Sequence, residues 1–306
     1  MQTLLRHTLS LSLVSALGLF GCAPIPNPVD AADAGSSPEA PPEAQPMPPV
    51  YETIHLPTAA VHVVTVPDPI RYPVQVAVVD ALERVDQIAA QVCEGEGCVA
   101  AAINAGFFDP NNGLTTSHVV IDGAQVADPS QNDRLVGNPD LASYMDRILN
   151  RSEFRRYDCG STPSYDITFH LEPVPAGCAL VDAVGAGPQL LPQDTSVAEG
   201  FVDQAVSRDA LGSQSLNARS AVGLKADGSV VLVMAAQVPG VSPSGMTMED
   251  IAAIMGDRGV VKALSLDGGS SSTLIYQSTT YFGRLNTSGE RVQRPVKSIL
   301  WVENLR

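Results

Sequence analysis

The chain is poor in basic residues. It has 18 Lys and Arg against 33 Asp and Glu among its 306 residues, which leaves a formal net charge of −15. Domains that bind nucleic acid carry a surplus of positive charge on at least one face. The composition therefore argues against a nucleic-acid partner, and an anionic ligand would need a local group of arginines.

Familiar catalytic and nucleotide-binding motifs are also missing. The sequence contains no Gly-x-Ser-x-Gly, no His-Glu-x-x-His, no Walker loop and no Gly-x-Gly-x-x-Gly. The five histidines are scattered and there is no Cys-x-x-Cys, so a zinc site is disfavoured. Candidate chemistry has to be sought in loops that follow strands.

No apolar run near the amino terminus reaches the length of about 20 residues that a membrane span needs. The run at 9–20 follows Arg6 and ends at Gly21-Cys22, the pattern of a bacterial lipoprotein signal. We predict a signal peptide at 1–21, a lipidated Cys22, and anchoring in the cell envelope at its periplasmic face or at the cell surface. An ordinary secreted protein with an incidental cysteine is the alternative.

Proline and alanine dominate the next segment, 22–50, which has nine prolines, four acids and no aromatic residue. Such a segment cannot bury enough surface to fold, so we predict a disordered tether. Residues 51–306 contain no second linker and are predicted to form a single large domain with its own core.

Four cysteines remain once Cys22 is assigned to lipidation, and an exported chain can oxidise them. Four cysteines allow three pairings. Loop closure favours the local pairs, Cys93 with Cys98 and Cys159 with Cys178.

Short strand-like runs outnumber helical patterns by a wide margin. Asp122-Gly123 and Asp227-Gly228 each separate two such runs and predict hairpin turns. Helices are predicted at 82–91, 139–150 and 248–258, the last with Thr247 as its cap. We predict an α+β fold with a mixed β-sheet, hairpins and flanking helices.

The most informative loop is Asp267 followed by two glycines and three serines, directly after the apolar run 260–266. Glycines let backbone amides and hydroxyls approach an oxyanion, while the acid projects from a rigid strand. The loop suits phosphate binding with acid–base or nucleophilic work. A plain turn capped by Asp267 explains the local pattern equally well.

Three further segments carry candidate ligands. Asn104 follows the run 99–103 and is suited to bind sugar hydroxyls, with Phe107 or Phe108 stacking on a sugar face. A cation site at Asp109, Asn111 and Asn112 lacks the acidic series that calcium loops use. Guanidinium groups for a phosphate are available at Arg219 and at Arg291 or Arg294, and a surface ion pair is the commoner role for any one of them.

A serine hydrolase is a separate possibility. Ser271 in the cluster Ser270 to Ser272 would need His118 or His170 as its base, and His170 is expected to pack within a strand.

Several blocks, in this order, resemble the phosphodiester glycosidase family from about residue 99 to the end. The blocks are INAGFFDP (103–110), VVIDG (119–123), GPQLL (187–191), NARSAVGLKADG (217–228), SGMTMEDIAAIM (244–255), LSLDGGSSSTLIY (264–276) and RPVKSIL (294–300).

The resemblance implies a hydrolase that cleaves the glycosidic bond of a sugar-1-phosphodiester, here in envelope or extracellular polysaccharide. It makes Asp267 the nucleophile or base, with Arg219 beside it, and assigns phosphate stabilisation to Arg219 and Arg294. Substrate contacts fall on the remaining candidates, Asn104, Gly106, Phe107, Gly268, Gly269, Ser270 and Ser271. No cofactor is expected, and the need for a divalent cation stays open.

The chain departs from the family pattern in two places. Relatives have an Asp-Gly pair after the strand-like run 230–234, where this chain reads Ala235-Ala236-Gln237-Val238. The stretch 130–178 lies outside the shared blocks and resembles an insert. A non-catalytic envelope lipoprotein that binds phosphorylated glycans with the same loop and arginines is a second expectation, beside the serine hydrolase.

Overall fold

The computed structural model describes residues 45–93, 95, 97–160 and 162–304. Residues 45–306 group into one compact unit. The predicted signal peptide, Cys22 and the tether up to residue 44 lie outside the described residues. Among the described residues, no helix has the length and apolar character to cross a membrane.

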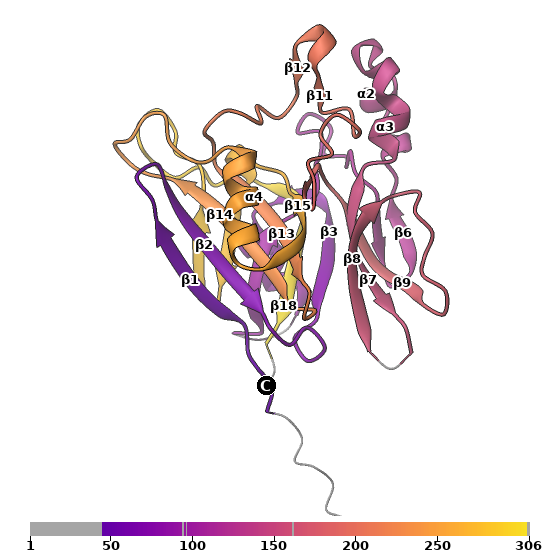
Figure 1. Cartoon of the computed structure of the whole chain (residues 1–306), viewed down its shortest axis with the longest axis vertical. Coiled ribbons are helices and arrows are strands. Elements are labelled where there is room, and N and C mark those ends of the chain that lie inside the picture. Colours follow the sequence, from indigo (N-terminus) through magenta and orange to yellow (C-terminus); the bar gives the residue numbers. More distant parts are fainter. Residues whose placement is uncertain (1–44, 94, 96, 161, 305–306) are drawn as a thin grey trace, which may run out of the picture. The chain divides into compact units, whose positions relative to one another are not determined.

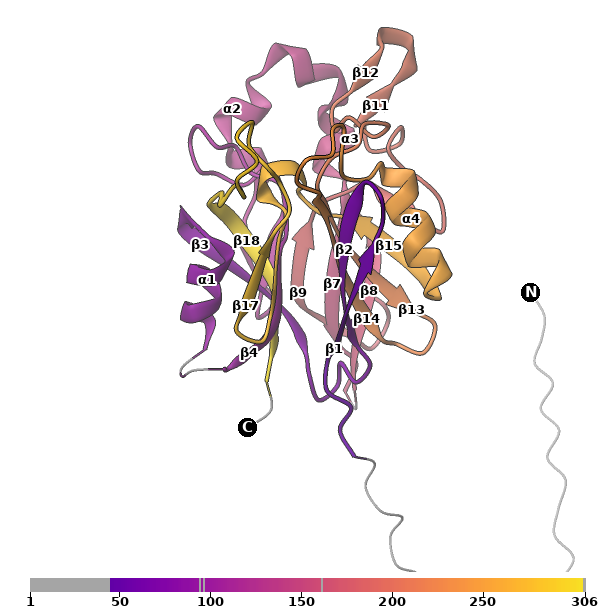
Figure 2. The ribbon, with the colours of Figure 1, turned by 90° about the vertical axis from the view of Figure 1, so that its left-hand side faces the viewer.

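Three antiparallel sheets make up this unit (Figures 1 and 2). In spatial order the first sheet contains β1 (Val50–His55), β2 (Ala59–Val66), β14 (Val230–Gln237), β13 (Arg219–Lys225), β15 (Val260–Ser265) and β10 (Gln189–Leu191). The second contains β17 (Thr279–Phe282), β16 (Thr273–Tyr276), β4 (Val99–Asn104), β18 (Val296–Glu303) and β3 (Val74–Glu83). The third contains β6 (Ala124–Ala127), β5 (Val119–Ile121), β9 (Ala179–Gly185), β7 (Ser152–Asp158) and β8 (Pro163–Phe169).

Helices are few and short. The α-helices are α1 (Val85–Val92), α2 (Asp133–Val136), α3 (Met145–Leu149) and α4 (Met248–Asp257). Single 3₁₀ turns are η1 (Pro129–Gln131), η2 (Pro139–Tyr144), η3 (Gln204–Val206) and η4 (Gly269–Ser271), and a small hairpin pairs β11 (Val202–Asp203) with β12 (Arg208–Asp209).

The prediction of a strand-rich fold with several hairpins is confirmed, but the mixed sheet is wrong. Every strand pair among the described residues is antiparallel. β15 reads as almost continuously apolar, apart from Lys262, because residues on both of its faces are covered: Leu264 packs into the core between the sheets, whereas Val260 and Ala263 pack under α4. Burial on two faces, which is typical of parallel sheets, here comes from layering.

The predicted helices are confirmed to different degrees. Helix α4 begins after Thr247, whose hydroxyl accepts from the Asp250 amide while the Asp250 side chain accepts from the Thr247 amide. Helix α1 starts later than predicted because β3 continues to Glu83. The predicted helix at 139–150 divides into η2 and α3.

The apparent insert at 130–178 is part of the fold, since it supplies β7 and β8 of the third sheet. The sequence pattern missed β7 because four of its seven residues are charged, namely Glu153, Arg155, Arg156 and Asp158. The Glu153 and Arg155 side chains are buried and bind each other, and Arg156 pairs with Asp182 on β9. A charged strand is stable here because the charges that point into the protein are neutralised in pairs.

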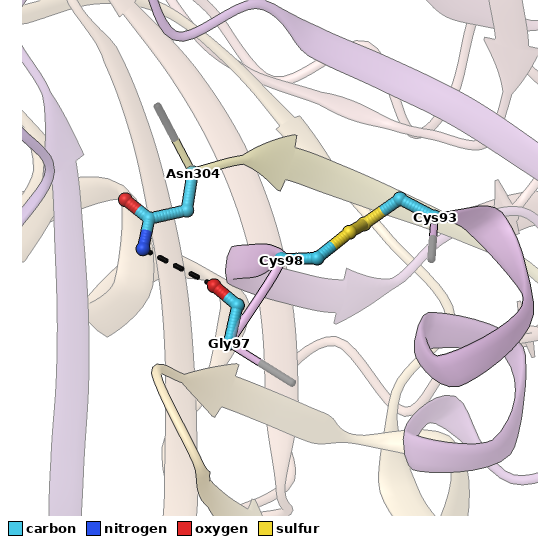
Figure 3. The surroundings of a disulfide bond; sticks show 4 residues. All are labelled: Cys93, Gly97, Cys98 and Asn304. Carbon is cyan, nitrogen blue, oxygen red and sulfur yellow. Dashed lines mark hydrogen bonds between the residues drawn. A yellow bond between two sulfur atoms is a disulfide. The ribbon is translucent and has the colours of Figure 1, made fainter. Parts of the chain in front are cut away.

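Both predicted disulfides are present, Cys93 with Cys98 and Cys159 with Cys178. The first joins the end of α1 to the start of β4, next to a hydrogen bond from Asn304 Nδ2 to the Gly97 carbonyl (3.1 Å; Figure 3). The second closes the segment that contains β8. Disulfides of this kind persist in oxidising compartments.

Candidate active site

The loop after β15 is fixed by backbone hydrogen bonds to two neighbouring segments. The Asp267 amide donates to the Ala105 carbonyl (2.9 Å), and the Gly269 amide donates to the Ala218 carbonyl (2.8 Å). Gly269 has a φ of +61°, a left-handed conformation that favours glycine at the turn into η4. Asp267 therefore projects from backbone that the first and second sheets hold between them.

Asn104 lies beneath this loop and is not accessible to solvent. Its side chain is fully buried, and its Nδ2 donates to the Asp267 carbonyl (2.5 Å). Its Oδ1 accepts from Ser220 Oγ (2.8 Å) and from the Thr273 amide (3.1 Å). The side chain predicted to bind sugar hydroxyls is thus used to position the backbone of the predicted catalytic acid.

Gly106 and Phe107 have different surroundings. A Cβ on Gly106 would stand 2.6 Å from the Gly185 carbonyl oxygen, so glycine is needed there for backbone packing against the third sheet. Phe107 lines the cavity above Asp267, and its ring centroid lies 5.7 Å from that of Phe201. Of this predicted pair, only Phe107 faces a space that a substrate can enter.

A cavity of about 250 Å³ opens above Asp267. Its wall combines one acid, three arginines, an aromatic ring and several apolar side chains. The lining residues are Phe107, Ala210, Leu211, Asn217, Arg219, Met248, Leu266, Asp267, Gly268, Gly269, Ser270, Arg284 and Arg294. The structure therefore brings together Phe107, Arg219, Arg294 and the Asp267 to Ser270 loop at one cavity.

Two of the arginines keep their charge available. Arg294 donates from Nη1 to Ser270 Oγ (2.8 Å), with its guanidinium carbon 5.1 Å from the centroid of the Phe108 ring. Arg284 donates from Nη1 to Asn217 Oδ1 (2.8 Å). Neither forms an ion pair within the described residues. Two guanidinium groups without carboxylate partners at one cavity suit an anion.

Arg219 is placed differently from the sequence prediction. Its side chain is buried and donates to four backbone carbonyls, those of Met246 (3.1 Å), Leu211 (3.1 Å), Gly212 (2.6 Å) and Ser215 (2.8 Å). A guanidinium has five N–H donors, so little remains for a phosphate. This arrangement favours a positioning role, in which Arg219 holds the loop that forms one wall of the cavity.

Asp267 is surrounded by protein on every side except the cavity. Burial raises the pKa of Asp267 to about 6, against the opposing effects of the Ser271 hydroxyl, the Arg294 charge and the Gly268 amide. A carboxyl group with this pKa is mostly ionised at neutral pH yet still takes up a proton within the physiological range. Such perturbed acids are frequent in active sites.

The serine and histidine pairing predicted as an alternative is not formed. His118 and His170 stack on each other with ring centroids 3.6 Å apart, and their other contacts lie in and beside the third sheet. Neither histidine lines the cavity at Asp267. Ser270 Oγ instead accepts from Arg294, so the cluster lacks the general base that a serine nucleophile needs.

A metal centre finds no support in the described part of the chain, where no group of three or more His, Cys, Asp or Glu is arranged to hold an ion. At the candidate cation loop, Asp109 pairs with Arg134 (2.6 Å) and accepts from the Asn111 side chain (3.0 Å). Asn112 Nδ2 donates to Asn132 Oδ1 (2.9 Å). The three side chains stabilise a turn.

Arg284 is the residue that the sequence analysis missed. It follows β17, a strand that no apolar run predicts, since this strand reads Thr279 to Phe282 with two threonines. The sequence signal for Arg284 was its position just after a strand, ahead of the arginines at 291 and 294.

Comparison with known proteins agrees with this geometry. The profile of the family described as phosphodiester glycosidase matches residues 97–303. No curated protein matches the chain in sequence.

Solved structures share the fold. The catalytic domain of zebrafish N-acetylglucosamine-1-phosphodiester alpha-N-acetylglucosaminidase, auto-inhibited by its pro-peptide, superposes with a TM-score of 0.62 at 19% identity, over 84% of this chain and 82% of that one. A hypothetical protein from Synechocystis (TM-score 0.53, 18% identity, 83% of this chain and 61% of that one) is also similar. So is a putative exported protein from Burkholderia pseudomallei K96243 (0.53, 14%, 80% and 74%).

At these identities the structures establish the fold alone, whereas the family profile spans more than half of the chain and includes every candidate residue from Asn104 to Arg294. The chain belongs to the phosphodiester glycosidase family.

Proposed function

We propose that this protein hydrolyses the glycosidic bond of a sugar-1-phosphodiester. The observation that carries the proposal is the composition of the Asp267 cavity, whose lining holds one carboxylate and two arginines, Arg284 and Arg294, that form no ion pair with the residues that the structure describes. Ordinary glycosidases use two carboxyl groups, one of them as an acid that protonates a poor leaving group. A phosphate monoester leaves without that help, so one acid suffices if cations stabilise the departing charge.

Asp267 acts at the anomeric carbon in this scheme. As nucleophile it forms a glycosyl ester while the C–O bond to phosphate breaks, and water then hydrolyses the ester. As base it takes a proton from water that attacks the same carbon directly. In both routes the products are the free sugar and a phosphate monoester, with the bonding electrons leaving on the phosphate oxygen.

Arg294 and Arg284 stabilise the phosphate. Their charges are preorganised at a partly enclosed wall, where an electrostatic contact is stronger than in water. Phe107, with Leu211 and Met248, supplies the apolar surface against which a sugar face packs. Four backbone amides of the loop already donate to protein carbonyls, those of Asp267, Gly269, Ser271 and Ser272. The loop can therefore bind the substrate through its side chains and its remaining backbone groups.

We further propose an exported, lipid-anchored location with substrates in envelope or extracellular polysaccharide. The two disulfides support an oxidising compartment. A Cys22→Ser variant tests the anchor: the protein should leave the membrane fraction, and continued membrane association would contradict lipidation. Neither a nucleic acid nor a cofactor takes part in this scheme, so activity should survive treatment with EDTA.

The direct test is turnover by the purified chain. Incubation with a methyl phosphodiester of N-acetylglucosamine-1-phosphate, one representative substrate, and with other sugar-1-phosphodiesters should release free sugar. An Asp267→Asn variant should release almost none. Saturable binding without product from any such diester would favour a glycan-binding protein instead, and equal rates for both proteins would remove Asp267 from the mechanism.

A further inference from the structure

Three arginines form a cluster where α3 meets the hairpin of β11 and β12 (Figures 1 and 2). This arginine cluster consists of Arg147 on α3, Arg151 directly before β7, and Arg208 on β12. None of the three residues is buried, so a ligand can reach them. They stand in the segments 130–178 and 192–216, outside the sequence blocks shared with the family. The shared blocks therefore do not account for the cluster.

Two aromatic rings hold the arginine cluster in place. The guanidinium carbons of Arg147 and Arg208 lie 4.8 and 4.6 Å from the centroid of the Tyr144 ring. The guanidinium carbon of Arg151 lies 3.7 Å from the centroid of the Phe201 ring. A cation–π contact attracts a cation without neutralising its charge. Three positive charges are therefore kept close together.

Most N–H donors of the arginine cluster are not used within the described part of the chain. Each arginine donates one hydrogen bond, of 3.2 or 3.3 Å, to a backbone carbonyl of the single loop 197–200. A guanidinium has five N–H donors, so each arginine retains donors for a ligand. Burial lowers the pKa of Arg151 to about 10, with the charge of Glu199 opposing this change and that of Arg208 adding to it. Arg151 therefore stays protonated at neutral pH.

Two acids beside the arginine cluster have other partners. Asp203 faces Arg208 across the hairpin and accepts from the Tyr144 hydroxyl (2.9 Å). The buried Glu199 carboxylate accepts from the Ser152 amide (3.0 Å) and from the Ser152 hydroxyl (2.9 Å). No arginine of the cluster forms an ion pair with a residue that the structure describes. The cluster thus keeps a positive surplus in a chain whose formal net charge is −15.

The arginine cluster lies next to the wall of the candidate active-site cavity that the sugar contacts in the proposed reaction. Phe107 lines this wall, and its ring centroid lies 5.7 Å from that of Phe201, the ring that Arg151 contacts. Ala210 also lines the cavity and directly follows β12, the strand of Arg208. A group attached to the sugar, on the side away from the bond that is cleaved, can therefore reach the cluster.

Phosphate is the anion that the arginine cluster suits best. Each guanidinium is a planar fork that can donate to two phosphate oxygens at once. Like charges without partners cost stability and are retained where a ligand supplies the missing charge. A polymer of sugar-phosphate units supplies such a group, because each of its sugars carries one phosphate at the anomeric carbon and another on a hydroxyl.

We propose that the arginine cluster binds a second phosphate, carried on a hydroxyl of the sugar whose anomeric bond is cleaved. This proposal rests on the proposed function, because it places that sugar against Phe107. The preferred substrate is then a polymer of repeating sugar-phosphate units, which the protein cleaves at internal positions.

Matched pairs of synthetic diesters test the proposal in the full chain. All have the same sugar and a methyl ester on the anomeric phosphate. One member of each pair carries a charged methyl phosphate on a hydroxyl of the sugar, the other a neutral dimethyl phosphate, with each free hydroxyl used in turn. For at least one hydroxyl, the charged member should have a KM at least about tenfold lower, since one charge-assisted hydrogen bond contributes roughly 10- to 100-fold. Equal KM values in every pair would overturn the second phosphate site.

The kind of anion is tested at the same hydroxyl. A carboxymethyl ether also carries one negative charge but offers two oxygens in place of a phosphate group. Its KM should lie between those of the charged and neutral phosphates. A carboxymethyl compound that binds as well as the charged phosphate would overturn the choice of phosphate.

Variants locate the effect. In an Arg147→Gln, Arg208→Gln double variant, the ratio of the KM of the neutral compound to that of the charged compound should fall from about tenfold or more to about one. Arg84→Gln is the matched control, because Arg84 pairs with Asp86 beside α1 and removes the same charge elsewhere. The control should keep the wild-type ratio. A folded double variant that keeps this ratio would contradict the assignment, and so would a control that loses it.

Failure of the second phosphate site is distinguishable from failure of the proposed function. Calorimetric titration of the Asp267→Asn variant with the charged and neutral compounds measures binding without turnover. Tighter binding of the charged compound supports the arginine cluster even if the wild-type protein hydrolyses neither. Hydrolysis of both compounds with equal affinities would retain the enzyme and overturn the second site.

Discussion

Two regions of the molecule place a carboxylate near arginine, and they treat it in opposite ways. In the third sheet, Glu153 pairs with Arg155 (2.8 Å) and with His170 (2.6 Å), and Arg155 also donates to the carbonyls of Phe169, His170 and Glu172. At the Asp267 cavity, the acid forms no ion pair with any residue that the structure describes, and Arg284 and Arg294 donate to the neutral side chains of Asn217 and Ser270.

The difference separates structural charge from functional charge. A buried charge is tolerated when partners neutralise it, as in the third-sheet charge cluster of Glu153, Arg155 and His170. Charges without partners cost stability and are retained where a ligand supplies the missing partner. We therefore assign fold stability to the first region and chemistry to the second, so substitutions in the two regions should have different effects.

The largest expected effect is on turnover. Asp267→Asn keeps the shape of the acid and removes its charge, so kcat/KM for a sugar-1-phosphodiester should fall about 10³- to 10⁴-fold. Circular dichroism and a melting curve would confirm that the variant is folded. A folded Asp267→Asn enzyme with more than a tenth of normal activity would place the chemistry elsewhere.

Glu153→Gln should act on stability instead. It leaves the Arg155 guanidinium buried without its counter-charge, which costs about 3–5 kcal/mol of unfolding free energy. Urea denaturation measures the change, and kcat/KM should stay near the wild-type value at a temperature where the variant is folded. A large loss of kcat with unchanged stability would reverse the roles of the two regions.

Loss of either cavity arginine should slow the departure of phosphate. Arg294→Met and Arg284→Met are each expected to lower kcat by about 10²-fold or more, as when one preorganised donor is removed from a charged transition state. Arg258→Met is a matched control, because Arg258 pairs with Glu52 on the first sheet (2.9 Å) away from the cavity. Equal changes in kcat for the three variants would mean that neither Arg294 nor Arg284 contacts the substrate.

A smaller effect follows from the pKa of Asp267. Its pKa is 3.8 in the unfolded chain and about 6 in the fold, so the folded state binds the proton more tightly and loses stability as pH rises between these values. Asp267→Asn should therefore match the wild type near pH 3.5 and be more stable at pH 7, by up to about 3 kcal/mol. Urea denaturation at both pH values tests this sign. A variant that is less stable at pH 7 would show that the ionised acid is satisfied.

The pH dependence of turnover has the same origin. If ionised Asp267 is the nucleophile or base, kcat/KM should rise about tenfold per pH unit below about 6 and level off above it. An activity that falls as pH rises through 6 would make Asp267 an acid catalyst.

The sequence pattern predicted those parts of the fold that depend on interactions between residues close in sequence. Thr247 and the apolar stripe of Met248, Ile251 and Met255 specify α4 wherever it packs. Asp122-Gly123 adopts positive φ at both residues in the turn between β5 and β6, because few other pairs tolerate it.

Tertiary partners determine what the sequence could not show. Glu153 and Arg155 make β7 look like a loop until their pairing is known. Asn104 and Arg219 have the chemistry of ligand-binding residues, but they bind the protein itself. Asn104 contacts the Asp267 and Thr273 backbone and the Ser220 hydroxyl, and Arg219 contacts four backbone carbonyls. Arg284 reaches the cavity through the β16 and β17 hairpin, a pairing that no local signal specifies.

In the proposed reaction, the oxygen of water ends on the anomeric carbon and the phosphate departs with its own oxygen. Isotope labelling tests this directly. Hydrolysis of a sugar-1-phosphodiester in water enriched in oxygen-18, followed by mass spectrometry of both products, shows which bond breaks. We expect the label at the anomeric hydroxyl of the released sugar. Label in the phosphate monoester would mean cleavage of the P–O bond, and would contradict a glycosidase with Asp267 at the anomeric carbon.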